Sequence, residues 1–384
     1  MRSQGISRGR FLALAGAAGG AATAGALLGA GPATATVPAP AGPGSRASRG
    51  LTYRGVCYEV GEASREAGWT TARMRADLTA VRNDLHANSV SVWGDGVEDL
   101  AATASEAAQR GLHVWLQPRL GDRPESEILD HLAETGRHAE RLRRNGAKVH
   151  LSVGCEFVLY VPGIVPGADA VERIENILKG NYDPEQMSLK LEAFIARAAA
   201  VGRSVFRGSL TYGASFDEEV DWKLFDVVSA NYYGYHPDRA AYVRDLKPLQ
   251  RWGKPVAISE CGSCTYVGAP EQGGMGWYDV IDDQKTPPEI KGGLVRSERT
   301  QAAYLSEVFD VFESMNLYAG MVFNFVSPEL PHVPDALHDL DIVSYSLVKT
   351  IQDRPHDPTS DWHWEPKESF RALAQRFERA RRCH

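Results

Sequence analysis

Short apolar runs and helical stripes alternate along the chain from residue 53 to its end. The apolar runs predict eight strands, at 53–58, 89–93, 112–117, 148–153, 206–212, 227–231, 255–259 and 320–325. Helical spacing between and after them predicts helices at 70–85, 97–110, 126–145, 184–201, 218–224, 239–252, 297–315 and 366–381. Most of the strands are nearly continuous apolar runs, which is typical of parallel strands buried on both faces.

Eight alternating β/α units predict an α/β fold with a single (β/α)8 TIM barrel. No glycine-rich nucleotide fingerprint follows the first strand, so a doubly wound nucleotide-binding sheet is disfavoured and no cofactor is expected. Long loops follow strands 4, 7 and 8, and the first two span about 157–182 and 262–291. Since one barrel uses a chain of this length, we assign residues 51–384 to a single catalytic domain.

The first fifty residues differ in composition from the rest. A basic start precedes an apolar stretch rich in Ala and Gly at 11–28, and Ala33-Thr34-Ala35 offers small residues for cleavage. We therefore predict an export signal at 1–35, a flexible linker at 36–50 and a secreted protein that is not inserted stably in a membrane after cleavage. The run Ser7-Arg-Gly-Arg-Phe-Leu12 resembles a twin-arginine motif with glycine in place of the second arginine. An uncleaved membrane anchor is disfavoured because the stretch is short and rich in glycine.

The net charge and the cysteine content exclude further classes of protein. The 384 residues have a formal net charge of −7, whereas a nucleic-acid footprint is basic and clustered. We therefore expect no nucleic-acid partner, and we expect a monomer. Five cysteines are too few for a disulfide-built scaffold, and their odd number leaves at least one free thiol or an intermolecular partner. Cys261 and Cys264 favour a local disulfide or two loop thiols over a redox or metal pair.

Two of the predicted strands end in a glutamate. Glu156 follows the fourth strand and Glu260 follows the seventh. The carboxyl ends of TIM-barrel strands form the face that carries the active site. Two carboxylates that face each other are the minimum apparatus for cleaving a glycosidic bond. The structural alternative is that each glutamate only bonds backbone amides at the end of its strand.

The remaining strand ends carry mostly aromatic, acidic and amide side chains, and Arg119 stands at the same rim. Aromatic faces pack against the C–H faces of sugar rings, while carboxylates and amides bond hydroxyl groups. This combination fits a carbohydrate better than a phosphorylated or apolar ligand. We predict an oligosaccharide or polysaccharide substrate, bound by Tyr58, Glu59, Trp93, Gln117, Tyr212, Asn231, Tyr232, Tyr233, Asn324, Phe325 and Trp362.

Several motifs resemble glycoside hydrolase clan A, whose members are retaining enzymes built on a TIM barrel. Lys254-Pro-Val-Ala-Ile-Ser-Glu260 resembles the KP(I/V)…(S/T)E strand of the clan. Asn231-Tyr232-Tyr233 is similar to the segment with the tyrosine that orients the nucleophile, and the segment 362–370 resembles the closing PK.(S/A)F segment. The resemblance extends from about residue 53 to 377. It implies cleavage of a β-linked glycan by double displacement, with Glu156 as acid/base and Glu260 as nucleophile.

Other positions depart from the clan. Cys155 stands where most members have an asparagine, and the arginine usual near the end of strand 2 is missing. Strand 8 offers Phe323, Asn324 and Phe325 where a tryptophan is usual. The resemblance therefore implies altered recognition of the reacting sugar. More narrowly, the segments 154–157 and 163–167 resemble actinobacterial secreted proteins often labelled abortive-infection proteins.

Two alternatives to a hydrolase remain at this stage. A carbohydrate-binding barrel that has lost catalysis would keep the rim without a working carboxylate pair. A metal-dependent barrel enzyme would use Cys57, Cys261 or the loop with His332 and His338. The spacing in that loop matches no standard set of metal ligands, so a hydrogen-bonded loop is favoured over a metal site.

Overall fold

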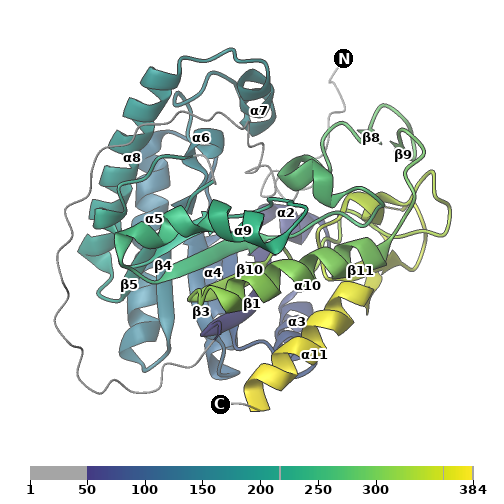
Figure 1. Cartoon of the computed structure of the whole chain (residues 1–384), viewed down its shortest axis with the longest axis horizontal. Helices are drawn as coiled ribbons and strands as arrows, with labels where there is room; N and C mark the ends of the chain where they lie inside the picture. Colours follow the sequence, from purple (N-terminus) through teal and green to yellow (C-terminus); the bar gives the residue numbers. More distant parts are fainter. Residues whose placement is uncertain (1–49, 216–217, 358, 383–384) are drawn as a thin grey trace.

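The computed structural model describes residues 50–215, 218–357 and 359–382. Its centre is an eight-stranded parallel sheet in the order β5-β4-β3-β2-β1-β10-β7-β6 (Figure 1). A parallel bridge between Ala214 and Ala230 joins the β5 and β6 edges, so the sheet closes and the predicted (β/α)8 barrel is confirmed. The strands are β1 (Tyr53–Val60), β2 (Ser89–Gly94), β3 (His113–Pro118), β4 (Val149–Cys155), β5 (Ser209–Gly213), β6 (Val228–Asn231), β7 (Val256–Cys261) and β10 (Ala319–Val322).

Helices surround these strands (Figure 1). They bury apolar stripes against the sheet, as α4 does with Leu100, Ala104 and Ala107. In the part of the chain that the structure describes, no helix has both the length and the apolar character needed to cross a bilayer. The main helices between and after the strands are α3 (Thr71–Asn83), α4 (Val97–Gln109), α5 (Glu125–Arg144), α8 (Pro184–Val205), α9 (Arg239–Leu246), α10 (Glu298–Ser314) and α11 (Glu368–Arg382).

Small elements lie between the main strands and helices, and the periodicity does not predict most of them. Short helices are α2 (Glu62–Glu66), α6 (Phe157–Tyr160) and α7 (Ala170–Leu178), and 3-10 turns lie at Trp222–Leu224, Lys247–Trp252, Pro270–Met275 and Leu340–Val343. Two small hairpins pair β8 (Ile281–Asp282) with β9 (Glu289–Ile290), and β11 (Val348–Gln352) with β12 (Trp362–Pro366). Elements this short have too few residues to show a period in the sequence.

Several predicted elements are shorter in the structure, and three of them differ most clearly. The helix expected at 239–252 ends at Leu246 and continues as a 3-10 turn, because Pro248 lacks a backbone N–H and disfavours helical geometry before it. The helix expected at 218–224 is only the turn Trp222–Leu224. The strand expected at 320–325 ends at Val322, although Phe323 and Phe325 still donate backbone bonds to neighbouring strands.

Aromatic rings fill the amino-terminal end of the barrel. The rings of Trp115 and His150 stack with centroids 4.3 Å apart, and Tyr53 packs 4.1 Å from His113. The two histidines contact each other through Nε2 of His113 and Nδ1 of His150. Burial lowers the pKa of His113 to about 3 and that of His150 to about 4, so both rings are neutral near pH 7. This end of the barrel is therefore a packed, uncharged core.

Candidate active site

The chain turns sharply where β4 ends. The β4–β5 ladder slips between Ser152 and Cys155, and Glu156 adopts left-handed backbone angles (φ 42°, ψ 55°), which are unfavourable for a residue with a side chain. Two bonds hold this turn: Glu156 N–H donates to the Gly213 carbonyl at 2.9 Å, and Phe157 N–H donates to the Tyr212 hydroxyl at 2.7 Å. Backbone strain of this kind persists where the surrounding structure fixes it, and it is common at functional sites.

Glu260 lies near the end of β7, opposite Asn231 of β6, where that ladder also slips. Three groups reach its carboxylate. Arg119 forms an ion pair with Oε1, the Tyr233 hydroxyl donates to Oε2 at 3.1 Å, and the Cys155 thiol lies 3.6 Å from Oε1. Arg119 follows β3, Tyr233 follows β6 and Cys155 ends β4, so three other barrel strands position this one side chain.

Asn231 and Cys155 stand between the two glutamates. Asn231 Nδ2 donates to Oε1 of Glu156 at 2.8 Å and lies 3.3 Å from Cys155 Sγ, which in turn contacts Glu260. The side-chain oxygen of Asn231, Oδ1, accepts a hydrogen bond from Ser259 Oγ at 2.8 Å, which fixes the orientation of the side-chain amide. The two carboxylates predicted from the strand endings therefore belong to one contiguous arrangement. We call Glu156, Glu260, Arg119, Asn231, Cys155 and Tyr233 the active-site cluster.

The two carboxyl groups have different electrostatic surroundings. Burial raises the pKa of Glu156 well above its ordinary value, and the charge of Glu260 raises it further. Burial also raises the pKa of Glu260, but the charge and hydrogen bond of Arg119 oppose this, as do the donors from Tyr233 and Cys155. A proton shared by the pair is therefore held on Glu156, while Glu260 is the better stabilised anion.

The contact of Arg119 with Glu260 was not predicted from the sequence. It follows β3, donates to Gln117 Oε1 at 2.5 Å and stacks its guanidinium 4.1 Å from the centre of the Trp93 ring. The structure thus supplies an arginine to Glu260 from strand 3, although the one usual in strand 2 is missing. The only sequence signal was an arginine two residues after a strand end that also carries a glutamine.

The carboxylate pair is covered in this structure. Glu156 is 0% exposed and Glu260 1%, and Trp93, Arg119 and Tyr160 lie around them with at most 5% exposure each. A hollow of about 270 Å³ borders Arg119, Cys155 and Tyr160, but neither Glu156 nor Glu260 lines it. Entry of a ring-sized substrate therefore requires side chains to move.

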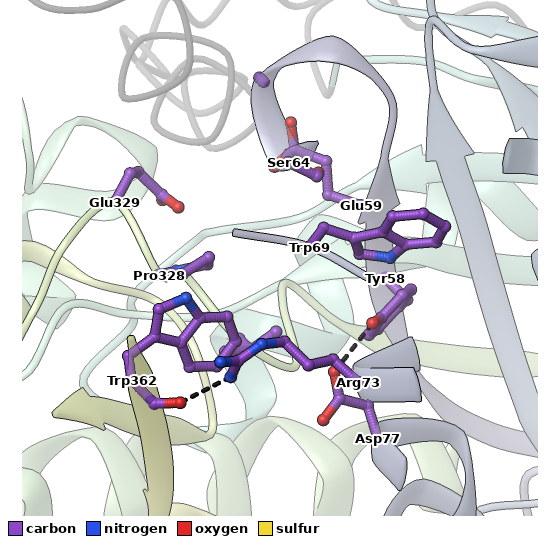
Figure 2. A pocket seen from close by; sticks show the side chains of 11 residues that line it. Tyr58, Glu59, Ser64, Trp69, Arg73, Asp77, Pro328, Glu329 and Trp362 are labelled. Carbon is purple, nitrogen blue, oxygen red and sulfur yellow. Dashed lines mark hydrogen bonds between the residues drawn. The ribbon is translucent and has the colours of Figure 1, made fainter. Parts of the chain in front are cut away.

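The predicted substrate-binding residues fall into three groups. Trp93, Gln117, Asn231 and Tyr233 lie at the carboxylate pair or at Arg119. A second group lines a separate hollow of about 420 Å³, which Figure 2 shows at the end of β1; its predicted members are Tyr58, Glu59 and Trp362. The third group makes its contacts elsewhere, among the packed elements of the barrel.

The third group consists of Tyr212, Tyr232, Asn324 and Phe325. The Tyr232 hydroxyl donates to Asp245 at 2.9 Å, on α9, whereas its neighbour Tyr233 faces Glu260. Tyr212 donates to Glu218 and supports the turn after Glu156. Phe325 packs against Trp364 with centroids 5.5 Å apart. Asn324 accepts a bond from Ser327 within its own loop.

The structure also shows what surrounds the cysteine pair, Cys261 and Cys264, and the loop with His332 and His338. Cys261 and Cys264 are buried free thiols that point to different backbone carbonyls, those of Met321 and Val343, so the local disulfide is not formed. Among the described residues, no group of three or more His, Cys, Asp and Glu side chains is arranged to hold a metal ion.

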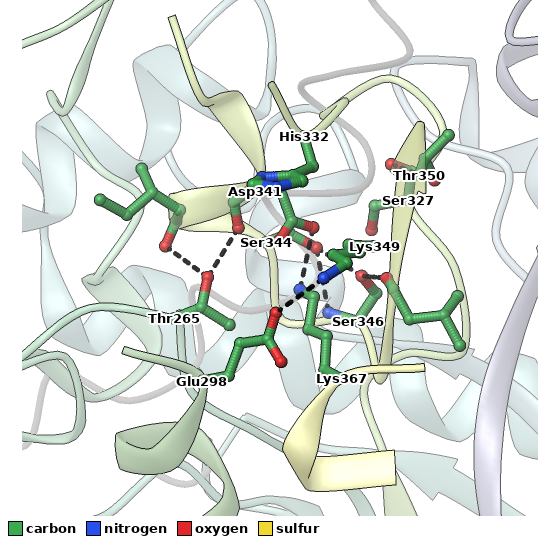
Figure 3. A network of polar contacts seen from close by, with 12 residues as sticks. Thr265, Glu298, Ser327, His332, Asp341, Ser344, Ser346, Lys349, Thr350 and Lys367 are labelled. Atoms are coloured by element: carbon green, nitrogen blue, oxygen red, sulfur yellow. Dashed lines mark hydrogen bonds and ion pairs between the residues drawn. The ribbon is translucent and has the colours of Figure 1, made fainter. Parts of the chain in front are cut away.

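The loop after β10 is held by an ion-pair network (Figure 3). Asp341, which is fully buried, pairs with Lys367 at 2.9 Å and with Arg296 at 2.7 Å. His332 bonds Asp339 at 2.9 Å, and Arg296 also reaches Asp339. The acidic groups near His332 are thus paired with cations of the chain. We call this set the loop network: Arg296, Glu298, His332, Asp339, Asp341, Lys349 and Lys367.

Comparison with known proteins agrees with the fold. No family model matches the sequence, and no curated protein matches it. Among solved structures, the GH113 β-mannanase AaManA from Alicyclobacillus acidocaldarius is similar, with a TM-score of 0.52 and 15% identity over 86% of this chain and 97% of that one. A β-glucuronidase from Bacteroides uniformis has a TM-score of 0.50 and 15% identity over 85% of this chain and 35% of that one. These likenesses show a shared (β/α)8 barrel.

Proposed function

We propose that the protein is a retaining β-glycosidase of the clan A type. The observation that carries the proposal is the placement of Glu156 and Glu260 at the ends of β4 and β7, joined through Asn231 and Cys155. The barrel is shared with a β-mannanase and a β-glucuronidase, which gives the proposal a consistent scaffold. The substrate is a β-linked oligosaccharide or polysaccharide.

The proposed reaction is a double displacement. Glu260 attacks the anomeric carbon while Glu156 donates its proton to the leaving oxygen, which gives a glycosyl-enzyme ester and a free alcohol. Glu156 then takes a proton from water, the water oxygen attacks the anomeric carbon, and Glu260 leaves as a carboxylate. The raised pKa of Glu156 suits its first role, and esterification of Glu260 removes the charge that helps raise it.

Three neighbours support these roles. Arg119 and Tyr233 hold the Glu260 carboxylate and stabilise its anion. Asn231 holds Glu156 through its amide. Since the pair is covered, we propose that substrate binding displaces the aromatic side chains above it, Trp93 and Tyr160.

A second candidate is a carbohydrate-binding barrel that no longer catalyses. The observation that favours it is the complete burial of both carboxylates, together with Cys155 at a position where the clan has an asparagine. In this alternative the ion pair of Arg119 with Glu260 stabilises the fold, and sugars bind only at the rim.

The test is hydrolysis of a panel of aryl β-glycosides and β-glucans by purified protein, with Glu260→Gln beside the wild type. The proposal expects release of the aryl alcohol, retention of the anomeric configuration in the first-formed sugar, and loss of activity in the variant. A hit that survives Glu260→Gln overturns the nucleophile assignment. Oligosaccharide binding by calorimetry without hydrolysis of any member favours the second candidate.

We also propose that the protein is exported as a monomer, with a signal at 1–35 and a linker at 36–50. The signal and nearly all of the linker lie outside the described residues. The resemblance to proteins labelled abortive-infection proteins likewise stays a prediction. Expression of the full chain in an actinobacterial host tests export: the proposal expects protein in the medium whose amino terminus begins after Ala35. Protein retained in the cytoplasm at full length would contradict it.

A further inference from the structure

The hollow of about 270 Å³ lies close to the carboxylate pair, and we call it the side hollow. Its walls come from the ends of β3 and β4, from α5 and from α6. Two of its lining residues also contact Glu260, because Arg119 pairs with that carboxylate and the Cys155 thiol lies 3.6 Å from its Oε1. A ligand group that enters the side hollow therefore lies against side chains that touch the proposed nucleophile.

Most of the wall of the side hollow is apolar. Ile128 and Leu132 line it from α5, Val153 from β4 and Phe157 from α6, and each of these side chains is at most 6% exposed. A surface of this kind favours an apolar ligand group, since contact with it removes that group from water. The same surface penalises a charge that it cannot pair.

The ionisable groups in the wall leave little net charge. Arg119 is paired with Glu260, and burial raises the pKa of the Cys155 thiol, which therefore stays neutral. His131 donates from Nε2 to the Asp95 carbonyl at 2.9 Å, and burial lowers its pKa, so its ring is neutral near pH 7. Among the described residues, no aspartate or glutamate lines the side hollow. An ammonium group would find no acid there, and a carboxylate would lie near Glu260 without a cation of its own.

The wall also holds hydrogen-bond donors that are not in use. Arg119 Nε and Nη1 and the Tyr160 hydroxyl are buried and have no hydrogen-bond partner among the described residues. The two side chains are neighbours, since the Arg119 guanidinium lies 5.7 Å from the centre of the Tyr160 ring. A buried donor without an acceptor is costly, so these groups favour a ligand that accepts hydrogen bonds. The side hollow thus combines apolar walls, little net charge and free donors.

We propose that the side hollow binds the acetamido group of an N-acetylhexosamine, so that the glycan substrate is N-acetylated. The acetyl methyl packs against Ile128 and Leu132, and the carbonyl oxygen accepts a hydrogen bond from Arg119. The Tyr160 hydroxyl can bond the same oxygen once its ring has moved from above the carboxylate pair. This proposal rests on the proposed glycosidase function and names its substrate class. A hydroxyl group in the same place would leave the apolar wall without a contact.

Calorimetry on full-length Glu156→Gln protein tests the proposal without hydrolysis, and this change keeps the ion pair of Arg119 with Glu260. The probes are three β-1,4 disaccharides: N,N′-diacetylchitobiose, its deacetylated counterpart and cellobiose. We expect the acetylated disaccharide to bind at least about tenfold more tightly than each of the others, because it gains a buried methyl and a hydrogen bond. Any other order, including no detectable binding of the acetylated disaccharide, overturns the proposal.

Filling the side hollow localises the effect. In the same background, Ile128→Phe should weaken binding of the acetylated disaccharide about tenfold, which removes its advantage over cellobiose. Leu129→Phe is the matched control, since Leu129 is the next residue of α5 and does not line the side hollow, and it should keep that advantage. A preference that survives Ile128→Phe overturns the site. If Ile128→Phe fails to fold, the comparison of disaccharides still decides, because it needs no change in the wall.

The outcomes separate the two proposals. A preference for the acetylated disaccharide with no hydrolysis of any glycan by wild-type protein contradicts the glycosidase function and leaves the acetamido site standing. Hydrolysis of glucans, lost in Glu260→Gln, without this preference supports the glycosidase and contradicts the acetamido site.

Discussion

Two of the places where the protein buries charge, the loop network and the active-site cluster, differ in their balance of carboxylates and cations. In the loop network Asp341 faces both Lys367 and Arg296, and each cation has a carboxylate within hydrogen-bond distance. In the active-site cluster two carboxylates share the single guanidinium of Arg119. Among the described residues, Glu156 Oε2 and Arg119 Nε and Nη1 have no hydrogen-bond partner. In the loop network, Asp341 Oδ1 and Lys367 Nζ also lack a hydrogen bond, but they face each other as an ion pair at 2.9 Å.

The difference separates a structural role from a chemical one. Burying a charge costs hydration, and this cost is offset only where an opposite charge lies close by with good geometry. A buried polar atom without a partner costs about 1–3 kcal/mol, and in the active-site cluster the carboxylates outnumber the cations. The loop network should therefore control stability, and the active-site cluster should control activity.

The largest expected effect concerns Glu156. Glu156→Gln replaces a carboxyl that is already protonated with a neutral side chain of the same shape. On an aryl glycoside whose leaving group needs protonation, kcat/KM should fall by about 10²–10⁴ because general acid catalysis is lost. The melting temperature should change little. A large loss of stability with unchanged activity would reverse the comparison.

The loop network is tested by Lys367→Met. This change leaves Asp341 with one cation fewer in a fully buried site, and urea unfolding should show a loss of about 3–5 kcal/mol. Activity measured below the new unfolding transition should be retained. Lys349→Met is the control: that side chain is 21% exposed, so at most about 1 kcal/mol is expected. Equal losses in both variants would show that burial does not set the effect.

A buried acid outside both clusters gives a pH-dependent prediction. Burial raises the pKa of Asp77 from 3.8 to about 6. The folded protein therefore holds this proton when the unfolded chain does not, and the stability this confers is present below about pH 4 and lost as pH rises through about 6. Relative to wild type, Asp77→Asn should gain up to about 3 kcal/mol between pH 4 and pH 8. Urea midpoints across this range measure the difference, and a constant difference would contradict the raised pKa.

The smallest expected effect distinguishes two adjacent tyrosines. Tyr233→Phe removes a hydrogen bond to the Glu260 carboxylate, so the pKa of Glu260 should rise. We expect kcat/KM to fall by about tenfold and the acidic limb of its pH profile to move to higher pH. Tyr232→Phe removes a bond to Asp245 instead and should leave the pH profile unchanged. If both variants behave alike, Tyr233 does not act through Glu260.

The barrel was predictable because its strands are continuous apolar runs and its helices carry regular stripes. The same regularity placed Glu156 and Glu260 at the ends of the fourth and seventh strands, so their proximity follows from topology alone. The hollow at the end of β1 was partly predictable: Tyr58 and Glu59 end the first strand, and Trp362 was expected at the rim.

The sequence could not show which way each side chain points. Tyr232 and Tyr233 look equivalent in the sequence, but the ladder slip beside Asn231 decides which one faces Glu260. The contact of Arg119 with Glu260 joins residues 141 positions apart and depends on the conformation of a long side chain. Ser64 of α2, Arg73 of α3 and Trp69 between the two helices close the hollow at the end of β1, and none of them belongs to a motif.

The left-handed backbone at Glu156 also has a consequence for protein engineering. Glycine adopts φ 42° without the strain that a side chain imposes, so it is the replacement that best preserves the turn after β4. Glu156→Gly would exchange a buried acid for a small chamber beside Glu260. A small anion such as azide or formate could occupy that chamber and attack the glycosyl-enzyme in place of water. In the proposed glycosidase, the turn that orients the acid would thus also make the site suitable for transferring sugars to external nucleophiles.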